Sequence, residues 1–205
     1  MFARIGGHPA LDLVNTVEWR LSPERLVDTL LDYADVVRWA VQSGLVTAED
    51  AAELGRQAEL APLEASAEAD RVRALREAVY AALFEAADAE DVVREYREAI
   101  AEGRLSVLEA SSVWDLPLDL ALPRRCIALE AFDLLTRADL ARIAQCQDAE
   151  CGWVFLDTSP RRDRRWCVSA ECGNRNRVRD YYARKRANGN GMGKLRERRE
   201  SGGPA

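Results

Sequence analysis

Four of the five cysteines in this 205-residue chain lie close together towards its C-terminal end. They form two pairs, Cys146 with Cys151 and Cys167 with Cys172, and four residues separate the members of each pair. Fifteen residues lie between the two pairs. Two close pairs joined by a loop can supply the four soft ligands that tetrahedral Zn²⁺ requires. The spacing therefore predicts one structural zinc ion per chain, held by these four cysteines.

Three other interpretations of the cysteines stay open: two disulfides, an iron–sulfur cluster, or four unrelated thiols. The sequence shows no secretion signal and no apolar run near the roughly 18 residues of a membrane span. We therefore expect a cytoplasmic protein without a membrane partner, in a compartment that disfavours disulfides. The spacing fits neither common ferredoxin pattern. Cys126 lies in an apolar helical stretch and is predicted to be a buried thiol; His8, the single histidine, is predicted to be neither ligand nor catalyst.

The charges of the chain are unevenly distributed. The net charge is −6, but residues 146–205 hold 14 basic and 8 acidic side chains, a local net charge of +6. The preceding 145 residues hold 15 basic and 27 acidic side chains, a net charge of −12. An acidic body with a basic end indicates that this end binds a polyanion.

The periodicity of apolar residues predicts a mainly helical body that would position the cysteines. A short helix is expected within residues 8–19. Further helices are expected over 33–43, 48–60, 67–100 with a break near Asp88, 124–135 and 137–145. Asp32 with Asp35, Thr47 with Asp50 and Thr136 with Asp139 are the predicted N-terminal caps, and Gly44 is a predicted helix end. Between Gly103 and Pro123 the pattern changes to that of a β-hairpin.

A basic helix is predicted directly after Cys172, with Asn174 as its N-cap. Arg175, Arg179 and Arg186 would share one face of this helix. The predicted nucleic-acid surface comprises Arg164, Arg165, Arg175, Arg177, Arg179, Arg184, Lys185 and Arg186. Four thiolates on a dication leave a charge of about −2, so at least one of the arginines nearest the cysteines is expected to support the metal site instead. Packing of the basic helix against the acidic body is the alternative.

The run CGWVFLDTSPRRDRRWCVSAECGNRNRVRDYY resembles the CGNR zinc-finger family, named for the motif found here at Cys172, Gly173, Asn174 and Arg175. The stretch ALDLVNTVEW resembles the start of the ABATE domain that precedes the finger in that family. The resemblance implies a stress-induced transcription regulator whose finger binds DNA. The departures at Asn176 and at residues 168–169 do not affect the ligands.

These observations predict three parts: an ABATE-like helical domain (1–140), a zinc finger with a basic helix (141–187) and a flexible basic tail (188–205). The sequence shows no phosphate loop, nucleophile turn or histidine pair, so no enzyme is predicted. The predicted function is zinc-dependent DNA binding in transcription regulation. An RNA-binding factor and a protein-interaction module are the alternatives. Asn15 and Thr16 could line a pocket for an unknown small-molecule effector or form a buried polar pair. The oligomeric state stays open.

Overall fold

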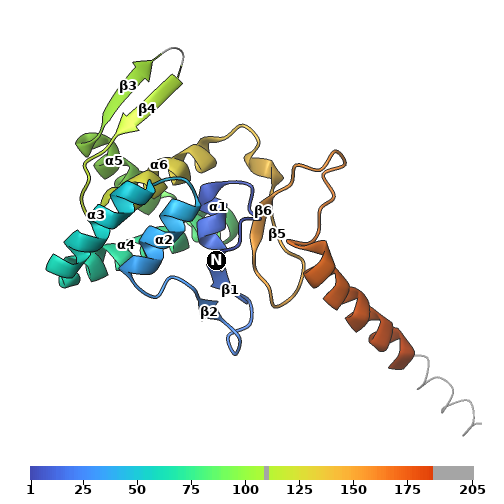
Figure 1. Ribbon diagram of the computed structural model, residues 1–205. Coiled ribbons are helices and arrows are strands. Elements are labelled where there is room, and N and C mark those ends of the chain that lie inside the picture. The colour runs from blue at the N-terminus through green and yellow to red at the C-terminus, as the bar shows by residue number, and fades with distance from the viewer. Residues whose placement is uncertain (109–110, 187–205) are drawn as a thin grey trace, which may run out of the picture. The chain divides into compact units, whose positions relative to one another are not determined.

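The computed structural model describes residues 1–108 and 111–186 (Figure 1). It divides into two compact units, residues 1–167 and a unit that begins at Val168, and each is described by itself. The predicted basic tail (188–205) lies outside the described residues, and the predicted domain boundary at residues 140/141 stays a prediction.

The first unit is mainly helical, as predicted. Its α-helices are α1 (Pro9–Val14), α2 (Tyr33–Gln42), α3 (Ala48–Leu60), α4 (Pro62–Phe84), α5 (Glu90–Glu102) and α6 (Leu122–Thr136). Its strands form three antiparallel pairs: β1 (Val17–Glu18) with β2 (Val27–Asp28), β3 (Arg104–Leu108) with β4 (Ser111–Asp115), and β5 (Ile143–Gln145) with β6 (Val154–Leu156). The β3–β4 pair is the predicted hairpin, and it extends away from the helices (Figure 1).

Local capping explains where several helices begin and end. Thr47 and Asp50 form a reciprocal capping box at the start of α3, and the Asp32 side chain accepts a hydrogen bond from the Asp35 amide at the start of α2. Gly44 ends α2 in the left-handed region, at φ 77°, where glycine is favoured. His8 caps α1, because its Nδ1 accepts a hydrogen bond from the Ala10 amide at 3.2 Å. The predicted break near Asp88 also lies between two helices.

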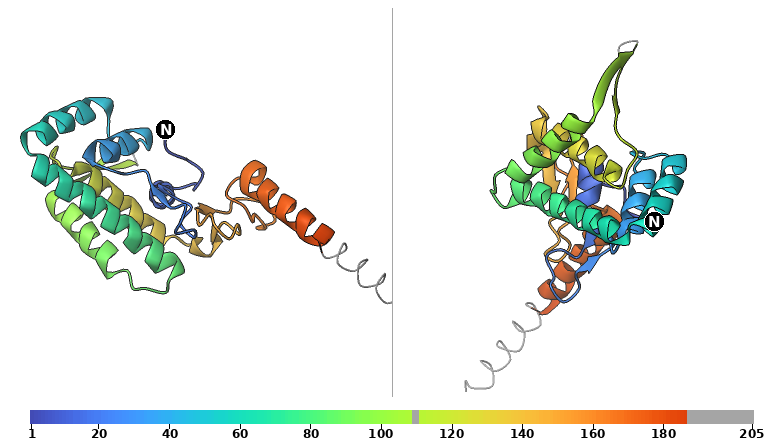
Figure 2. Two further views of the ribbon diagram at one scale, coloured as in Figure 1. Left: turned by 90° about the horizontal axis from the view of Figure 1, so that it is seen from below. Right: turned by 90° about the vertical axis from the view of Figure 1, so that its left-hand side faces the viewer.

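The hydrophobic core of the unit surrounds α1. Helices α4, α5 and α6 lie side by side (Figure 2), and α1 packs against α4 and α6. Leu11, Leu13 and Val14 of α1 are fully buried. Val154 and Leu156 of β6 belong to the same core. The strand that follows the first cysteine pair is therefore packed as part of the helical body.

A buried ion-pair network joins α4, α5 and α6. Arg124 of α6 is 3% exposed, and its guanidinium donates to Glu68 of α4 and to Glu95 of α5. Arg71 of α4 donates to Glu95 at 3.0 Å and to Glu98. Such a network fixes the alignment of the three helices, since each charge needs its partner once water is excluded.

The predicted helix over residues 137–145 is wrong. Thr136 is the last residue of α6, and its hydroxyl donates back to the Phe132 carbonyl at 2.8 Å. A short 3₁₀ turn, η1 (Leu140–Arg142), and strand β5 follow. Strand β5 is extended because it pairs with β6, with Gln145 opposite Val154. This tertiary pairing overrides the local helical pattern.

The second unit contains the predicted basic helix. A π-helical turn, η2 (Ser169–Gly173), comes first, and α-helix continues over residues 174–186. Asn174 is not the N-cap, because its backbone is already helical, at φ −67° and ψ −45°. Val168, at φ −133° and ψ 116°, is the extended residue that precedes the helical backbone. No helix within residues 1–108 and 111–186 combines the length and hydropathy needed to cross a membrane.

Candidate metal centre

The β5–β6 hairpin positions the first cysteine pair. Cys146 directly follows β5, and its amide donates to the Trp153 carbonyl at 2.8 Å. The turn between the strands is organised by Asp148, which is fully buried. Its carboxylate accepts from the Glu150 amide at 3.1 Å, and its carbonyl accepts from the Cys151 amide at 3.2 Å. The turn thereby returns Cys151 to the side of Cys146.

A loop held by Arg164 positions Cys167. The guanidinium of Arg164 donates to the carbonyls of Trp166, at 3.1 Å, and Cys167, at 2.6 Å. It also lies 4.0 Å from the centre of the Phe155 ring, a cation–π distance. Arg164 therefore orders the backbone beside a cysteine, and these contacts occupy the guanidinium that was predicted to face nucleic acid.

The fourth cysteine, Cys172, lies in the π-helical turn of the second unit. Arg175 donates to its sulfur at 3.0 Å, and Asn176 donates to its carbonyl at 2.9 Å. The expectation that an arginine supports the cysteine site is confirmed by Arg164 and Arg175. A cation that donates to sulfur favours the thiolate, which is the form that binds metal.

The four sulfurs converge. They all lie within 4.8 Å of one another, and those of Cys151 and Cys167 are 3.6 Å apart. All four cysteines are buried, with exposed fractions between 2% and 6%. A tetrahedral ion with zinc–sulfur bonds of about 2.3 Å sets its ligands about 3.8 Å apart. The observed separation is far above the roughly 2.05 Å of a disulfide, and none of the five cysteines, all of which lie in the described residues, forms a disulfide.

The close sulfurs change each other's acidity. The hydrogen bond from Cys151 holds the pKa of Cys146 well below the usual range of a thiol, and the same contact raises the pKa of Cys151. The contact therefore favours the thiolate at Cys146 and the thiol at Cys151, whereas a divalent cation would favour the thiolate at all four sulfurs. Cys126 differs, because burial raises its pKa to about 11 and keeps it protonated. The donor set, burial and spacing fit a zinc ion with four protein ligands.

The first 17 residues hold β6 in place. The Asn15 side chain donates to the Val154 carbonyl at 2.9 Å and accepts from the Val154 amide at 2.7 Å. The Leu156 amide donates to the Gly6 carbonyl at 2.8 Å, and the Trp153 indole donates to the Val17 carbonyl at 3.2 Å. The hairpin that carries Cys146 and Cys151 is thus built into the helical body by backbone-directed bonds.

Asn15 and Thr16 were predicted either to line an effector pocket or to form a buried polar pair. Together with residues such as Phe2, Glu18 and Arg38, they line a cavity of about 350 Å³. Thr16 is also bonded within the chain, since its hydroxyl donates to the Leu13 carbonyl at 2.6 Å and accepts from Arg76 at 3.1 Å. These bonds favour the interpretation as a buried polar pair, and the effector pocket here stays a prediction.

We expect Asn15→Ala to destabilise the protein by about 2–4 kcal/mol, because it leaves the buried amide and carbonyl of Val154 without partners. Urea unfolding followed by circular dichroism would measure this change. Asn174→Ala removes the same atoms from an exposed asparagine and should change the free energy of unfolding by only a few tenths of a kcal/mol. Equal effects of the two substitutions would show that the Asn15 bonds contribute nothing.

The remaining residues of the predicted nucleic-acid surface differ in their contacts and in their solvent exposure. Arg165 donates to the Gln147 side chain at 2.6 Å. On helix 174–186, Arg175 and Arg179 are half-buried. The other members of the predicted surface on that helix are exposed: Arg177, Arg184, Lys185 and Arg186. These four residues are therefore the better candidates for contacts with a polyanion.

Sequence reasoning missed two residues that order the site, Asp148 and Asn176. Asp148 had a usable signal, since an Asp two residues after Cys146 is well placed to form a turn stabilised by its own side chain. Asn176 had none, because its bond to the Cys172 carbonyl depends on the π-helical turn.

Two family models match the chain. The CGNR zinc finger model matches residues 142–185, and the ABATE model, described as "Putative stress-induced transcription regulator", matches residues 7–138. A comparison with curated proteins found no match. The ABATE match alone covers more than half of the 205 residues, and the finger match contains all four clustered cysteines. The chain therefore belongs to the ABATE family, whose model bears that description, and carries a CGNR zinc finger at its C-terminal side.

Proposed function

We propose that the protein is a DNA-binding transcription regulator whose finger is assembled around one structural zinc ion held by Cys146, Cys151, Cys167 and Cys172. The convergence of four buried sulfurs within 4.8 Å is the observation that supports this proposal. Four protein ligands would leave the ion without an open position for water, so we infer a structural and not a catalytic role. We accordingly propose that the protein acts in the cytoplasm as a regulator and not as an enzyme.

Helix 174–186 is the proposed DNA-binding element. Arg177 and Arg184 are seven residues apart, so they lie on one face of the helix, with Tyr181 between them on the same face. Both arginines are exposed, and Tyr181 is 57% exposed. Guanidinium groups can neutralise phosphates, and a tyrosine hydroxyl can add a hydrogen bond to the same backbone. The net charge of −12 on residues 1–145 supports the assignment of polyanion binding to the basic end.

Salt dependence tests this surface. Each phosphate contact contributes a slope of about −0.9 in log affinity against log salt, so replacing Arg177 and Arg184 together by Ala should make the slope shallower by about two. Fluorescence anisotropy with a labelled DNA duplex over a salt series would measure it. Arg97→Ala with Arg104→Ala removes the same charge from exposed positions of the helical body and should leave the slope unchanged.

An unchanged slope in the Arg177/Arg184 variant would reject helix 174–186 as the DNA surface. Competition between duplex DNA and single-stranded RNA at matched salt distinguishes the RNA-binding alternative, since that alternative requires RNA to displace the duplex. A wild-type protein without salt-dependent affinity for either nucleic acid would favour the protein-interaction alternative. Under this proposal the helical body senses a signal, and the finger acts on that signal through its binding to DNA.

A further inference from the structure

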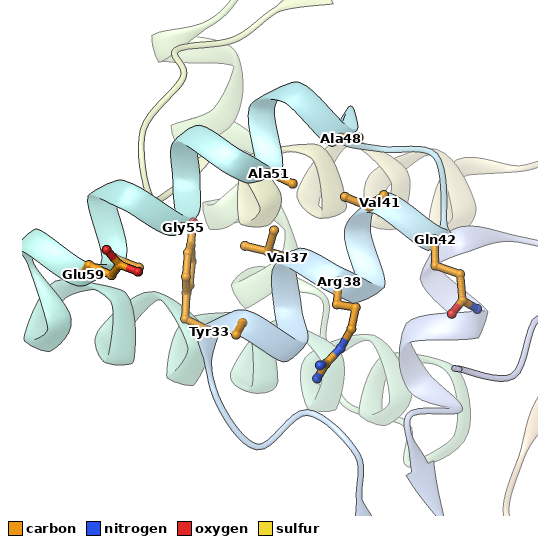
Figure 3. Close-up of a pocket in the computed structure, with 11 residues that line it drawn as sticks. Tyr33, Val37, Arg38, Val41, Gln42, Ala48, Ala51, Gly55 and Glu59 are labelled. Atoms are coloured by element: carbon orange, nitrogen blue, oxygen red, sulfur yellow. The ribbon is translucent and has the colours of Figure 1, made fainter.

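A cavity lies along the α2–α3 helix pair, and Arg38 and Gln42 line both this cavity and the Asn15–Thr16 cavity. Its volume is about 720 Å³, within the roughly 300–1,000 Å³ typical of sites for small molecules. Its walls are apolar: Val37 and Val41 project from α2 towards α3, and Ala51 faces them from α3 (Figure 3). The aromatic ring of Tyr33 stands beside Gly55 and closes one part of the groove (Figure 3).

Gly55 leaves the groove open at its centre. It lies inside α3, where glycine is less favourable than alanine. A Cβ atom added at Gly55 would meet nothing within 4 Å, and its backbone does not have the positive φ that would require glycine. Packing within the described chain therefore does not demand a glycine here. Its absent side chain widens a groove that an additional molecule could fill.

The charges around the groove favour a cation. Arg38 forms an ion pair with Asp35 of its own helix, and Figure 3 shows its side chain directed away from α3. Glu59 lies on α3 one turn beyond Gly55, is exposed, and has no salt-bridge partner within residues 1–108 and 111–186. The carboxylate of Glu59 is thus the uncompensated charge at the groove, on a body that is itself strongly acidic.

We propose that the α2–α3 groove binds an amphipathic organic cation, with its apolar part between Val37, Val41 and Ala51 and its ammonium group beside Glu59. The Tyr33 ring adds an aromatic edge to this site. Its hydroxyl is held by the Leu120 carbonyl at 2.8 Å, which fixes the position of the ring without involving the ligand. The inference rests on the proposed signal-receiving role of the helical body and gives that role a ligand class and a location.

Isothermal titration calorimetry with three probes tests the charge preference: 1-naphthylmethylammonium, the neutral 1-naphthylmethanol and the anionic 1-naphthylacetate. The cation should bind about fivefold more tightly than the neutral probe, as one partly exposed ion pair allows, and the anion more weakly than both. Glu59→Gln should remove the preference for the cation while leaving the affinity for the neutral probe unchanged. Glu49→Gln, an equal charge change on the same helix outside the groove, should preserve it.

Filling the groove tests its location. Gly55→Leu should lower the affinity for the cationic and neutral probes together by at least about tenfold, because the new side chain occupies the apolar space. Gly55→Ala is the accompanying fold control, since its Cβ meets open space and alanine is the better helix former. Its circular dichroism spectrum should match that of the wild type.

Three results would overturn the inference: equal affinity of all three probes, an unchanged cation preference in Glu59→Gln, or undiminished binding in Gly55→Leu. A fourth is that no probe binds and Gly55→Leu dissociates an oligomer in gel filtration, which would identify the groove as an interface between two copies. Each titration is independent of DNA, so a negative result leaves the proposed DNA-binding function untouched. Failure of the salt-series experiment likewise leaves the groove titrations interpretable.

Discussion

The Cys167→Ser variant is expected to bind zinc at least about 100-fold more weakly than the wild-type protein, because loss of a ligand should exceed the 10–100-fold cost of changing a residue that only supports a ligand. Elemental analysis of the purified protein after dialysis would show about one zinc per chain for the wild type and close to none for the variant. Structural zinc contributes about 10–16 kcal/mol of binding free energy in small fingers, so the surrounding chain should lose order with the metal.

Cys126→Ser is the matched control for this variant. Cys126 belongs to α6 and is half-buried, apart from the four sulfurs that converge. It should retain the full zinc content and the wild-type helical circular dichroism. Equal loss of zinc from Cys126→Ser and Cys167→Ser would contradict the assigned ligand set.

Loss of zinc should loosen only part of the finger. Strand β6 is held by Asn15 and by the Gly6 carbonyl, both of which belong to the helical body. Residues 157–173 contain the loop and the turn that present Cys167 and Cys172. Hydrogen exchange after chelation should therefore rise over residues 157–173 and stay low in β6.

The second large effect is expected for Arg124→Met, which should destabilise the protein by about 3–5 kcal/mol. Arg124 is 3% exposed and donates to Glu68 at 2.6 Å and to Glu95, which is itself 6% exposed. Methionine preserves much of the apolar volume but removes the buried cation that both carboxylates share. It leaves them with only the partly exposed Arg71, which lies 3.0 Å from Glu95 and 3.7 Å from Glu68. The midpoint of urea unfolding should fall, with the dependence of the free energy on urea unchanged.

Arg94→Met provides the comparison, because Arg94 forms an exposed ion pair with Asp91 in which the two side chains are 59% and 64% exposed. Exposed pairs contribute about 0–1 kcal/mol, so the change should be small. Similar destabilisation by Arg94→Met and Arg124→Met would mean that burial of the network adds nothing to its strength.

The cysteine site was largely predictable from the sequence, because two cysteine pairs with equal spacing can be combined into a four-ligand metal site in few ways. The helical body was predictable for the same kind of reason: apolar periodicity and side-chain caps such as Thr47 with Asp50 act over a few residues. The break between α4 and α5 and the β3–β4 hairpin also follow local signals. These features depend on short-range chemistry, which a single sequence displays directly.

The features that sequence reasoning missed depend on residues far apart in the chain. Residues 143–145 have a helical pattern but form β5, because β6 offers a pairing partner. The sequence allows Asn15 to be either a ligand-facing or a buried polar residue, but it does not identify the partner, which is the backbone of Val154, 139 positions away. The α2–α3 groove arises from the packing of two helices, which periodicity does not reveal.

The bonds between the first residues and β6 have a consequence for how the protein is made. Asn15 and Val154 are separated by 139 positions in the chain. At about 5–20 residues per second, the ribosome needs roughly 7–28 s to synthesise that stretch. During this time α1 and the segment before it lack β6 as a binding partner. The contact between Asn15 and Val154 therefore forms late and joins residues that are far apart in the chain. The metal site should therefore assemble only after the residues up to Cys172 have been synthesised and β6 has bound Asn15.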